Sequence, residues 1–297
     1  MLYGALEAGG TKCLCAVGDA PQHLQDITAI PTTSPARTLA AISEYFARYP
    51  IDGIGVASFG PVDLDPHSSD YGMITRSPKQ EWQGANFRQY LQGKLGVPVA
   101  IDTDVTAALL AEQSLGAALG TTRCVYLTIG TGIGGSFWTG EGVYHGLWHP
   151  EIGHIRIPRV DDDHFIGCCP FHGDCLEGLA SGEAIRQRWN QNPDTLPLTH
   201  RAWSMEAEYL ALGLVALFYI LVPQRIVLGG GVMQQSQLFP MIRANVSTLL
   251  NGYLKPFAES KVLDDVIVPP HFRNTAGLVG AMQLAISLTK GRRTDSP

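Results

Sequence analysis

A short pattern that occurs twice, a strand followed by a glycine-rich turn, most constrains the fold of this chain. The first copy is the apolar segment 2–6, followed by Glu7-Ala8-Gly9-Gly10-Thr11-Lys12. The second copy is the segment 124–129, followed by Gly130-Thr131-Gly132-Ile133-Gly134-Gly135, more than 100 residues further along the chain. Such a repeat predicts a duplicated core. We therefore expect an α/β fold with two domains and a cleft between them.

The length of the chain, 297 residues, is sufficient for two such domains with substantial cores. We expect a smaller α/β domain over residues 1–116, to which a C-terminal helix over about 276–290 returns. A larger α/β domain over residues 117–275 follows, and it carries a loop rich in cysteine and histidine. The segment 116–120 is the expected hinge, because glycines at its two ends can absorb changes in backbone dihedral angles.

The charge and hydropathy of the chain exclude several classes of partner. The formal net charge is -6, so the chain has no excess of positive charge with which to bind a nucleic acid or an anionic membrane. We therefore expect neither as a partner. The N-terminal residues show neither the basic region nor the long apolar region of a secretory signal. The longest apolar-rich run, 209–222, is interrupted by Gly213 and is too short to span a bilayer, so it predicts a buried core helix. We expect a cytoplasmic protein.

Both glycine turns have the chemistry to bind a polyphosphate. Backbone without Cβ atoms can approach phosphate closely and direct its N–H groups at the oxygens. Tight turns also need glycine for purely structural reasons, but a matched pair favours a nucleotide bound between the halves. A third turn, Gly229-Gly230-Gly231, is expected beneath the adenosine. The expected ATP-binding residues are Gly9, Gly10, Thr11, Lys12, Thr131, Gly132, Gly134 and Gly230.

Asp104 is the candidate general base. It lies in Ile101-Asp102-Thr103-Asp104-Val105, between an expected strand and an expected helix. A carboxylate at such a junction can accept the proton of a sugar hydroxyl, and phosphoryl transfer otherwise depends on alignment and charge neutralisation. Two alternatives stay open at this point. Asp104 caps the helix and does no chemistry, or Asp102 is the base.

A cluster of cysteines and histidines predicts a metal site. In an intracellular chain of this size, clustered Cys and His favour a metal over a disulfide framework. Four such side chains suit tetrahedral Zn²⁺ and leave no position open for a catalytic water, so the expected role is structural. The expected ligands are His154, Cys169, His172 and Cys175. Cys168 and His164 are alternative ligands, and unpaired core thiols without a metal are the remaining interpretation.

Taken together, these motifs resemble the ROK family of repressors and sugar kinases, within the actin-like ATPase superfamily. The resemblance spans nearly the whole chain and implies a ribonuclease H-like fold that closes over ATP and a sugar. Its two most specific marks are Glu151-Ile152-Gly153-His154 and Cys175-Leu176-Glu177-Gly178-Leu179-Ala180-Ser181-Gly182. The other marks are Ala8-Gly9-Gly10-Thr11, Thr103-Asp104-Val105 and the turn 130–135.

The resemblance also implies roles for individual residues. Asp104 is implied as the general base, and His154 as both a zinc ligand and a sugar ligand. Glu7 stands where many relatives have Asp, and Cys169-Pro170-Phe171-His172 stands where many have Cys-x-Cys. These two departures resemble the bacterial fructokinase branch. The implied sugar-binding residues are Thr103, Asp104, Glu151, His154 and Glu177, with Thr103 where the family commonly has Asn.

We therefore expect ATP-dependent phosphorylation of D-fructose to fructose 6-phosphate, with Mg²⁺ accompanying ATP and a structural Zn²⁺. The resemblance also implies a homodimer. Alternative substrates are mannose, glucose or an N-acetylated hexosamine. A non-catalytic sugar sensor is a further alternative, although Asp104 and intact phosphate turns argue against it. The first turn begins close to Met1, so we do not expect the helix-turn-helix of the family's repressors.

Overall fold

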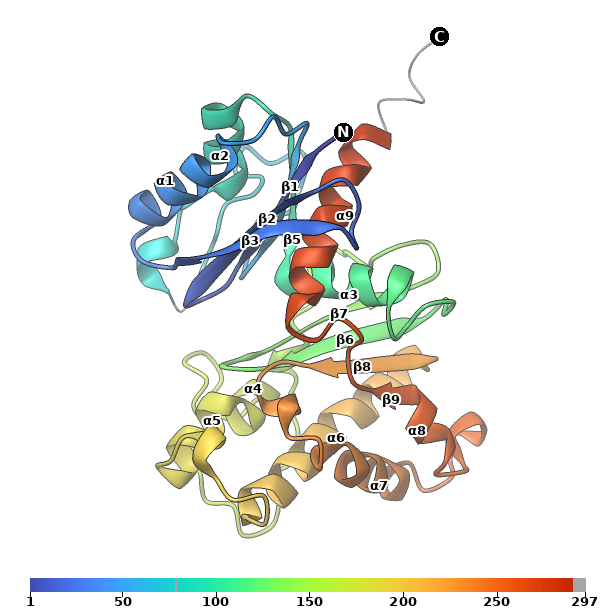
Figure 1. Ribbon diagram of the computed structural model, residues 1–297. Helices are drawn as coiled ribbons and strands as arrows, with labels where there is room; N and C mark the ends of the chain where they lie inside the picture. The colour runs from blue at the N-terminus through green and yellow to red at the C-terminus, as the bar shows by residue number, and fades with distance from the viewer. Residues whose placement is uncertain (78, 291–297) are drawn as a thin grey trace. The chain divides into compact units, whose positions relative to one another are not determined.

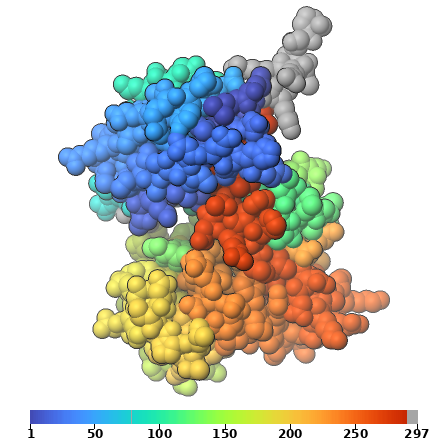
Figure 2. Space-filling view, viewed as in Figure 1, coloured from blue at the N-terminus to red at the C-terminus, as the bar shows by residue number. Residues whose placement is uncertain are grey.

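A computed structural model describes residues 1–77 and 79–290 of the chain. The described residues form two compact units. The first contains residues 1–111, 145–149 and 274–290, and the second contains residues 112–144 and 150–273. In Figure 2 the blue N-terminal segments form most of the visible surface of the first unit, and yellow and orange helical segments form most of that of the second.

The first unit is built on a five-stranded sheet with the strand order β3-β2-β1-β4-β5. Its strands are β1 (Tyr3–Ala8), β2 (Lys12–Gly18), β3 (Leu24–Pro31), β4 (Ile54–Ser58) and β5 (Val99–Thr103). β1, β2 and β3 are antiparallel neighbours, whereas β1, β4 and β5 run parallel. The parallel strands β1, β4 and β5 end at the same edge of the sheet, which places Glu7 and Asp104 at that edge.

Helices cover both faces of this sheet, as Figure 1 shows. One face packs on α1 (Pro35–Phe46) and α2 (Phe87–Leu95), and the other on α9 (Ala276–Lys290) with the start of α3 (Asp104–Leu115). Small residues bring α9 unusually close. A Cβ added at Gly55 of β4 would lie 1.8 Å from the carbonyl oxygen of Ala281, and one at Gly280 would lie 1.8 Å from that of Ala107. The glycines at these two positions therefore permit backbone-to-backbone packing.

The second unit repeats the strand arrangement of the first. Its four-stranded sheet has the order β7-β6-β8-β9, with β6 and β7 antiparallel and β6, β8 and β9 parallel. The bounds are β6 (Cys124–Ile129), β7 (Ile133–Trp138), β8 (Arg225–Gly229) and β9 (Ile267–Val268). This order matches β2-β1-β4-β5 strand for strand, which is the duplicated core that the two glycine-turn motifs predict.

The helices of the second unit enclose its main hydrophobic core together with the sheet. They are α4 (Leu176–Ala180), α5 (Gly182–Trp189), α6 (Arg201–Leu221), α7 (Leu238–Leu250) and α8 (Val262–Val266). By length and composition α6 could cross a membrane, but 56% of its most apolar window is buried inside the protein. The predicted core helix is therefore present, but it starts earlier than the run 209–222 indicates.

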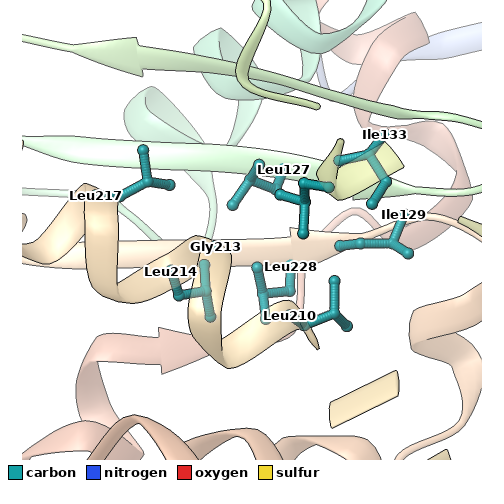
Figure 3. Close-up of a pocket in the computed structure, with 9 residues that line it drawn as sticks. Leu127, Ile129, Ile133, Leu210, Gly213, Leu214, Leu217 and Leu228 are labelled. Atoms are coloured by element: carbon teal, nitrogen blue, oxygen red, sulfur yellow. The ribbon is translucent and has the colours of Figure 1, made fainter. Parts of the chain in front are cut away.

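A small apolar cavity lies between α6 and the sheet (Figure 3). Leu127, Leu214 and Leu228 point toward one another there. Gly213 makes room for α4, because a Cβ at this position would lie 2.7 Å from a methyl group of Leu176. The cavity is lined by aliphatic side chains and glycine, so it lacks groups that could bind a phosphate or a sugar.

Two buried carboxylates in the second unit have opposite environments. Glu112 is fully buried, and its two oxygens accept the backbone N–H groups of Ala117, His271 and Phe272. Glu206 in α6 is also buried, but neither of its oxygens has a hydrogen-bond partner among the described residues. Burial raises the pKa of Glu206 well above its usual value. Burial therefore favours the protonated, uncharged form of Glu206.

Candidate functional site

The first glycine turn joins β1 to β2 and is fixed by its own hydrogen bonds. The N–H of Gly9 donates to the carbonyl of Lys12 at 3.0 Å, so it is used inside the turn. Thr32, just after β3, donates its hydroxyl to the carbonyl of Gly9 at 2.8 Å and its N–H to that of Thr11. The N–H groups of Gly10 and Thr11 have no partner among residues 1–77 and 79–290. They are the donors that the turn can offer to an anion.

The second glycine turn joins β6 to β7 and rests on a carboxylate. Glu177 of α4 accepts the N–H of Ile133 at 2.9 Å. A Cβ at Gly132 would lie 2.5 Å from Oε2 of Glu177, so a larger residue there would displace the carboxylate from its present position. Thr131 is exposed at the tip of the turn, and Gly134 is part of β7. Glu177 is thus tied to the turn, in addition to its predicted role as a sugar ligand.

The third glycine turn follows β8. Gly230 has a φ of 91°, and a Cβ at this position would lie 2.3 Å from the carbonyl oxygen of Ile129. A left-handed conformation combined with this close contact requires glycine. The structure therefore gives Gly230 a conformational reason to be glycine, and its predicted contact with the nucleotide remains a prediction.

Asp104 is the first residue of α3, directly after β5. The preceding Thr103 caps the helix, since its hydroxyl accepts the N–H of Thr106 at 3.2 Å and donates to the Thr106 hydroxyl at 2.8 Å. Asp104 is therefore not needed as the cap, which disfavours that alternative. Oδ1 of Asp104 accepts the N–H of Val105 at 2.9 Å, and desolvation by the surrounding protein raises the pKa of Asp104 to about 6.

Thr103, a predicted sugar ligand, and Asp102, the alternative base, both have partners within the protein. Thr103 is 4% exposed and its hydroxyl is engaged in the cap, so its contact with a sugar remains a prediction. The carboxylate of Asp102 lies 3.1 Å from Nε2 of His145 and accepts the N–H of Thr103 at 2.7 Å. These contacts favour Asp104 over Asp102 as the group available for proton transfer.

The carboxyl group of Glu7 lies at the end of β1, close to the start of α9. Oε2 of Glu7 is buried and has no partner in the described part of the chain. A Cβ at Gly277 would lie 2.6 Å from the carboxyl carbon of Glu7. Burial, together with the negative charge of Asp104, raises the pKa of Glu7 to about 7. Two carboxyl groups with raised pKa values in one unit are typical of a functional site.

Four side chains of the second unit converge as a candidate metal site. The ligand atoms of His154, Cys169, His172 and Cys175 all lie within 4.8 Å of one another. Nδ1 of His154 is 3.3 Å from Nδ1 of His172, 3.7 Å from Sγ of Cys169 and 3.5 Å from Sγ of Cys175. Of the two alternative ligands, the Cys168 thiol lies 3.8 Å from the hydroxyl of Ser181, and His164 is exposed.

His154 uses its two ring nitrogens in different directions. Nδ1 faces the Cys/His cluster, and Nε2 lies 4.0 Å from Oε2 of Glu151. A carboxylate behind a metal-binding histidine fixes the orientation of the ring. His154 and Glu151 are both predicted sugar ligands, and they are neighbours at the short 3₁₀ helix Ile152–His154.

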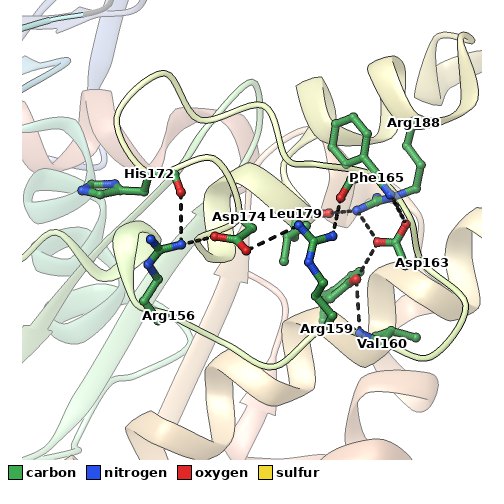
Figure 4. Close-up of polar contacts among 10 residues, drawn as sticks. Arg156, Arg159, Val160, Asp163, Phe165, His172, Asp174, Leu179 and Arg188 are labelled. Carbon is green, nitrogen blue, oxygen red and sulfur yellow. Dashed lines mark hydrogen bonds and ion pairs between the residues drawn. The ribbon is translucent and has the colours of Figure 1, made fainter.

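Ion pairs hold the loop that carries this cluster (Figure 4). Asp174 pairs with Arg156 and Arg159. Asp163 pairs with Arg188 at 3.2 Å, and both side chains are less than a tenth exposed. Burial opposes ionisation of Asp163, but hydrogen bonds from Tyr209 and a backbone N–H, with the Arg188 charge, hold its pKa below the usual value. The loop is therefore anchored on both sides of the cluster.

Comparison with known proteins identifies the family. The model of the ROK family matches residues 3–287. The chain belongs to the ROK family. The family and fold-class predictions are thus confirmed. This ROK protein is 40% identical to the fructokinase of Pediococcus pentosaceus, over 98% of this chain and 99% of that protein. It is 39% identical to the fructokinase of Zymomonas mobilis subsp. mobilis (strain ATCC 31821 / ZM4 / CP4), over 96% of this chain and 97% of that one.

A solved structure of the family has the same fold. The ROK hexokinase from Thermus thermophilus matches with a TM-score of 0.78 and 27% identity, covering 98% of this chain and 100% of that chain. The likeness extends over both units of this ROK protein, so the predicted actin-like fold with a duplicated core holds for the whole described chain.

Some features of the site were not evident from the motifs. No motif assigns a role to His145, because its contact with Asp102 joins residues far apart in the chain. The motifs also do not predict that Glu7 is close to Asp104. For Glu7 there is a usable signal, since an acid within the otherwise apolar strand β1 has to face either a charge or a ligand.

Proposed function

We propose that this chain transfers the γ-phosphoryl group of Mg-ATP to the 6-hydroxyl of D-fructose. The observation that carries the proposal is Asp104, a carboxyl with a raised pKa whose neighbour Thr103 already caps the helix. Identity of 40% and 39% to two fructokinases, over nearly the full chain, supports fructose as the sugar. The match to the hexokinase is weaker, at 27% identity.

In this function Asp104 accepts the proton that the sugar hydroxyl loses as the new O–P bond forms. The residues Glu151, His154 and Glu177 hold other sugar hydroxyls, since carboxylates are strong acceptors and the Nε2 of His154 faces away from the metal cluster. The glycine turns bind the phosphates of ATP through backbone N–H groups, with Thr11, Lys12 and Thr131 at their tips. Mg²⁺ accompanies ATP and neutralises charge on the phosphates.

The Cys/His cluster binds Zn²⁺ in this proposal. Bonds of about 2.3 Å to sulfur and about 2.0–2.1 Å to nitrogen place tetrahedral ligand atoms about 3.3 Å (N to N) and about 3.6 Å (N to S) apart. The observed separations of His154 Nδ1 from the other three ligand atoms, 3.3, 3.7 and 3.5 Å, fit these values. A full set of four protein ligands gives the ion a structural role. The ion then orders the loop between His154 and α4, which carries Glu177.

Location and assembly are part of the same proposal. Free hexoses are phosphorylated by ATP inside cells, so we place the enzyme in the cytoplasm. A homodimer is proposed on the family resemblance alone. A non-catalytic sugar sensor has no use for a base such as Asp104, so the kinase is the better account of the site.

A hexose panel tests the proposed substrate. ADP release should be measured in a coupled assay with fructose, mannose, glucose and N-acetylated hexosamines. We expect kcat/KM for fructose to exceed that for each other sugar by about tenfold or more. A sugar that does not match the pocket leaves buried polar groups of the protein without hydrogen-bond partners, and this weakens its binding. A higher value for another hexose would replace fructose as the substrate. Hexose binding without ADP release would support the sensor.

The raised pKa of Asp104 predicts a pH dependence. The base has to be ionised, and its pKa is about 6, so kcat/KM should rise with pH up to about 6 and then level off. Below pH 6 we expect a fall of about tenfold per pH unit. The measurement is kcat/KM for fructose from pH 5 to pH 8, with circular dichroism at each pH as the folding control. A flat profile in folded protein would contradict Asp104 as the base.

A further inference from the structure

Lys79 lies over the first glycine turn although it is far from the turn in sequence. A Cβ added at Gly10 would lie 3.1 Å from Cε of Lys79 and 4.0 Å from its Nζ. Lys79 is half-buried, and its ammonium group has no carboxylate partner among the described residues. An unpaired cation held beside free backbone N–H groups is an arrangement that suits an anion.

The position of Lys79 is fixed by buried structure. The carbonyl of Lys79 accepts the N–H of Trp82, and Ser77 accepts the N–H of Lys79 through its hydroxyl at 3.2 Å. Trp82 is fully buried and stacks on Phe87, with ring centroids 5.3 Å apart. These contacts hold the start of the 3₁₀ helix Gln80–Trp82, and with it the backbone of Lys79.

Two adjacent residues after β3, Thr32 and Thr33, hold the first glycine turn and Trp82, and Trp82 in turn fixes the backbone of Lys79. The indole N–H of Trp82 donates to the carbonyl of Thr33 at 3.0 Å. The preceding residue, Thr32, donates its hydroxyl to Gly9 and its N–H to Thr11. Lys79 and the donors of the turn are therefore positioned by adjacent residues. Such a shared support preorganises the ammonium group relative to the N–H groups of Gly10 and Thr11.

The two lysines near the turn differ in their surroundings. Lys12 is exposed, and its charge acts on Glu7, where it partly offsets the rise in pKa. Lys79 is half-buried, and its charge acts on the thiol of Cys13, where it partly offsets the rise in pKa. It forms no ion pair with a carboxylate in the described part of the chain, so its charge is available for a ligand. The negative charge of Asp104 also reaches Glu7, which stands two residues before Gly9. The turn and the proposed base are thus close to each other within the first unit.

We propose that Lys79 is a catalytic residue that binds the terminal phosphate of ATP together with the N–H groups of Gly10 and Thr11. This inference rests on the proposed kinase function. The phosphate nearest the base is the one that is transferred, so the ammonium group stabilises charge that builds up on that group during transfer. The motif Ala8-Gly9-Gly10-Thr11 does not reveal this residue, because Lys79 belongs to another loop.

The test compares four proteins: the wild type, Lys79→Met, Lys79→Arg and the surface control Lys94→Met. Calorimetric titration measures binding of the non-hydrolysable analogue β,γ-imido-ATP and of ADP. We expect Lys79→Met to bind the analogue about tenfold or more weakly, with ADP binding nearly unchanged. Lys79→Arg should retain most of the affinity, and Lys94→Met should match the wild type. Thermal unfolding of each variant checks that it is folded.

Turnover gives the second readout. Removing one such donor typically lowers kcat by about 10²- to 10³-fold, and we expect Lys79→Met to fall in this range with KM for fructose unchanged. Binding of the analogue by folded Lys79→Met within twofold of the wild type would overturn the inference. A wild-type protein that releases no ADP with any hexose would instead refute the proposed function, while the titration would still decide the role of Lys79.

Discussion

Asp104→Asn should abolish nearly all fructokinase activity while leaving the protein folded. Asn has the same shape as Asp but cannot accept the proton of the sugar hydroxyl, so kcat should fall by about 10²- to 10⁴-fold. The amide can still accept the N–H of Val105, and Thr103 still caps α3. KM for fructose should therefore change much less than kcat. Initial rates with saturating ATP give both constants.

Asp102→Asn is the matched comparison for Asp104→Asn. Asp102 lies two residues away, and its carboxylate is already engaged by His145 and by the N–H of Thr103. We expect its replacement to lower kcat by less than about tenfold, because it disturbs a partly exposed ion pair and no proton transfer. If Asp102→Asn loses activity and Asp104→Asn keeps it, Asp102 is the general base and Asp104 is not.

Removal of the proposed zinc ion should destabilise the second unit strongly. A structural zinc site can contribute on the order of 10 kcal/mol to folding. Cys169→Ser removes one of the four proposed ligands, so we expect loss of bound zinc, a large drop in melting temperature and loss of activity. A strong chelator added to the wild-type protein should have the same effects. Elemental analysis and thermal unfolding measure the two physical quantities directly.

The adjacent cysteine is the control for this experiment. Cys168 is outside the cluster, and its thiol lies near the hydroxyl of Ser181. Cys168→Ser should retain zinc, and its melting temperature should stay close to that of the wild type. Absence of zinc from wild-type protein purified without chelators would refute the zinc proposal. Loss of zinc in Cys168→Ser but not in Cys169→Ser would show that Cys168, and not Cys169, is the ligand.

Local patterns in the sequence predict much of this architecture. The two glycine turns mark the ends of β1 and β6, because a sharp turn without side chains is encoded within a few residues. The spacing of Cys169, His172 and Cys175 indicates a shared ligand set for the same reason, since one loop carries all three. The strand-to-helix junction at Asp104 is also a local feature.

Contacts between distant segments could not be predicted in this way. The Lys79 side chain lies over Gly10 from a loop that is held by the stacking of Trp82 on Phe87. The environment of Glu7 depends on α9, which comes from the end of the chain. The first turn of α6 is another example, since its Ala202 and Trp203 are buried although they lie outside the apolar run 209–222. Such features need the tertiary fold.

The identity of the product tests the central claim most directly. Phosphorus NMR of a reaction of the wild-type protein with fructose and Mg-ATP resolves which hydroxyl receives the phosphoryl group. The account predicts one fructose 6-phosphate for each ADP formed. Phosphate on another hydroxyl of fructose, or ADP formed with free phosphate and no sugar phosphate, would contradict it.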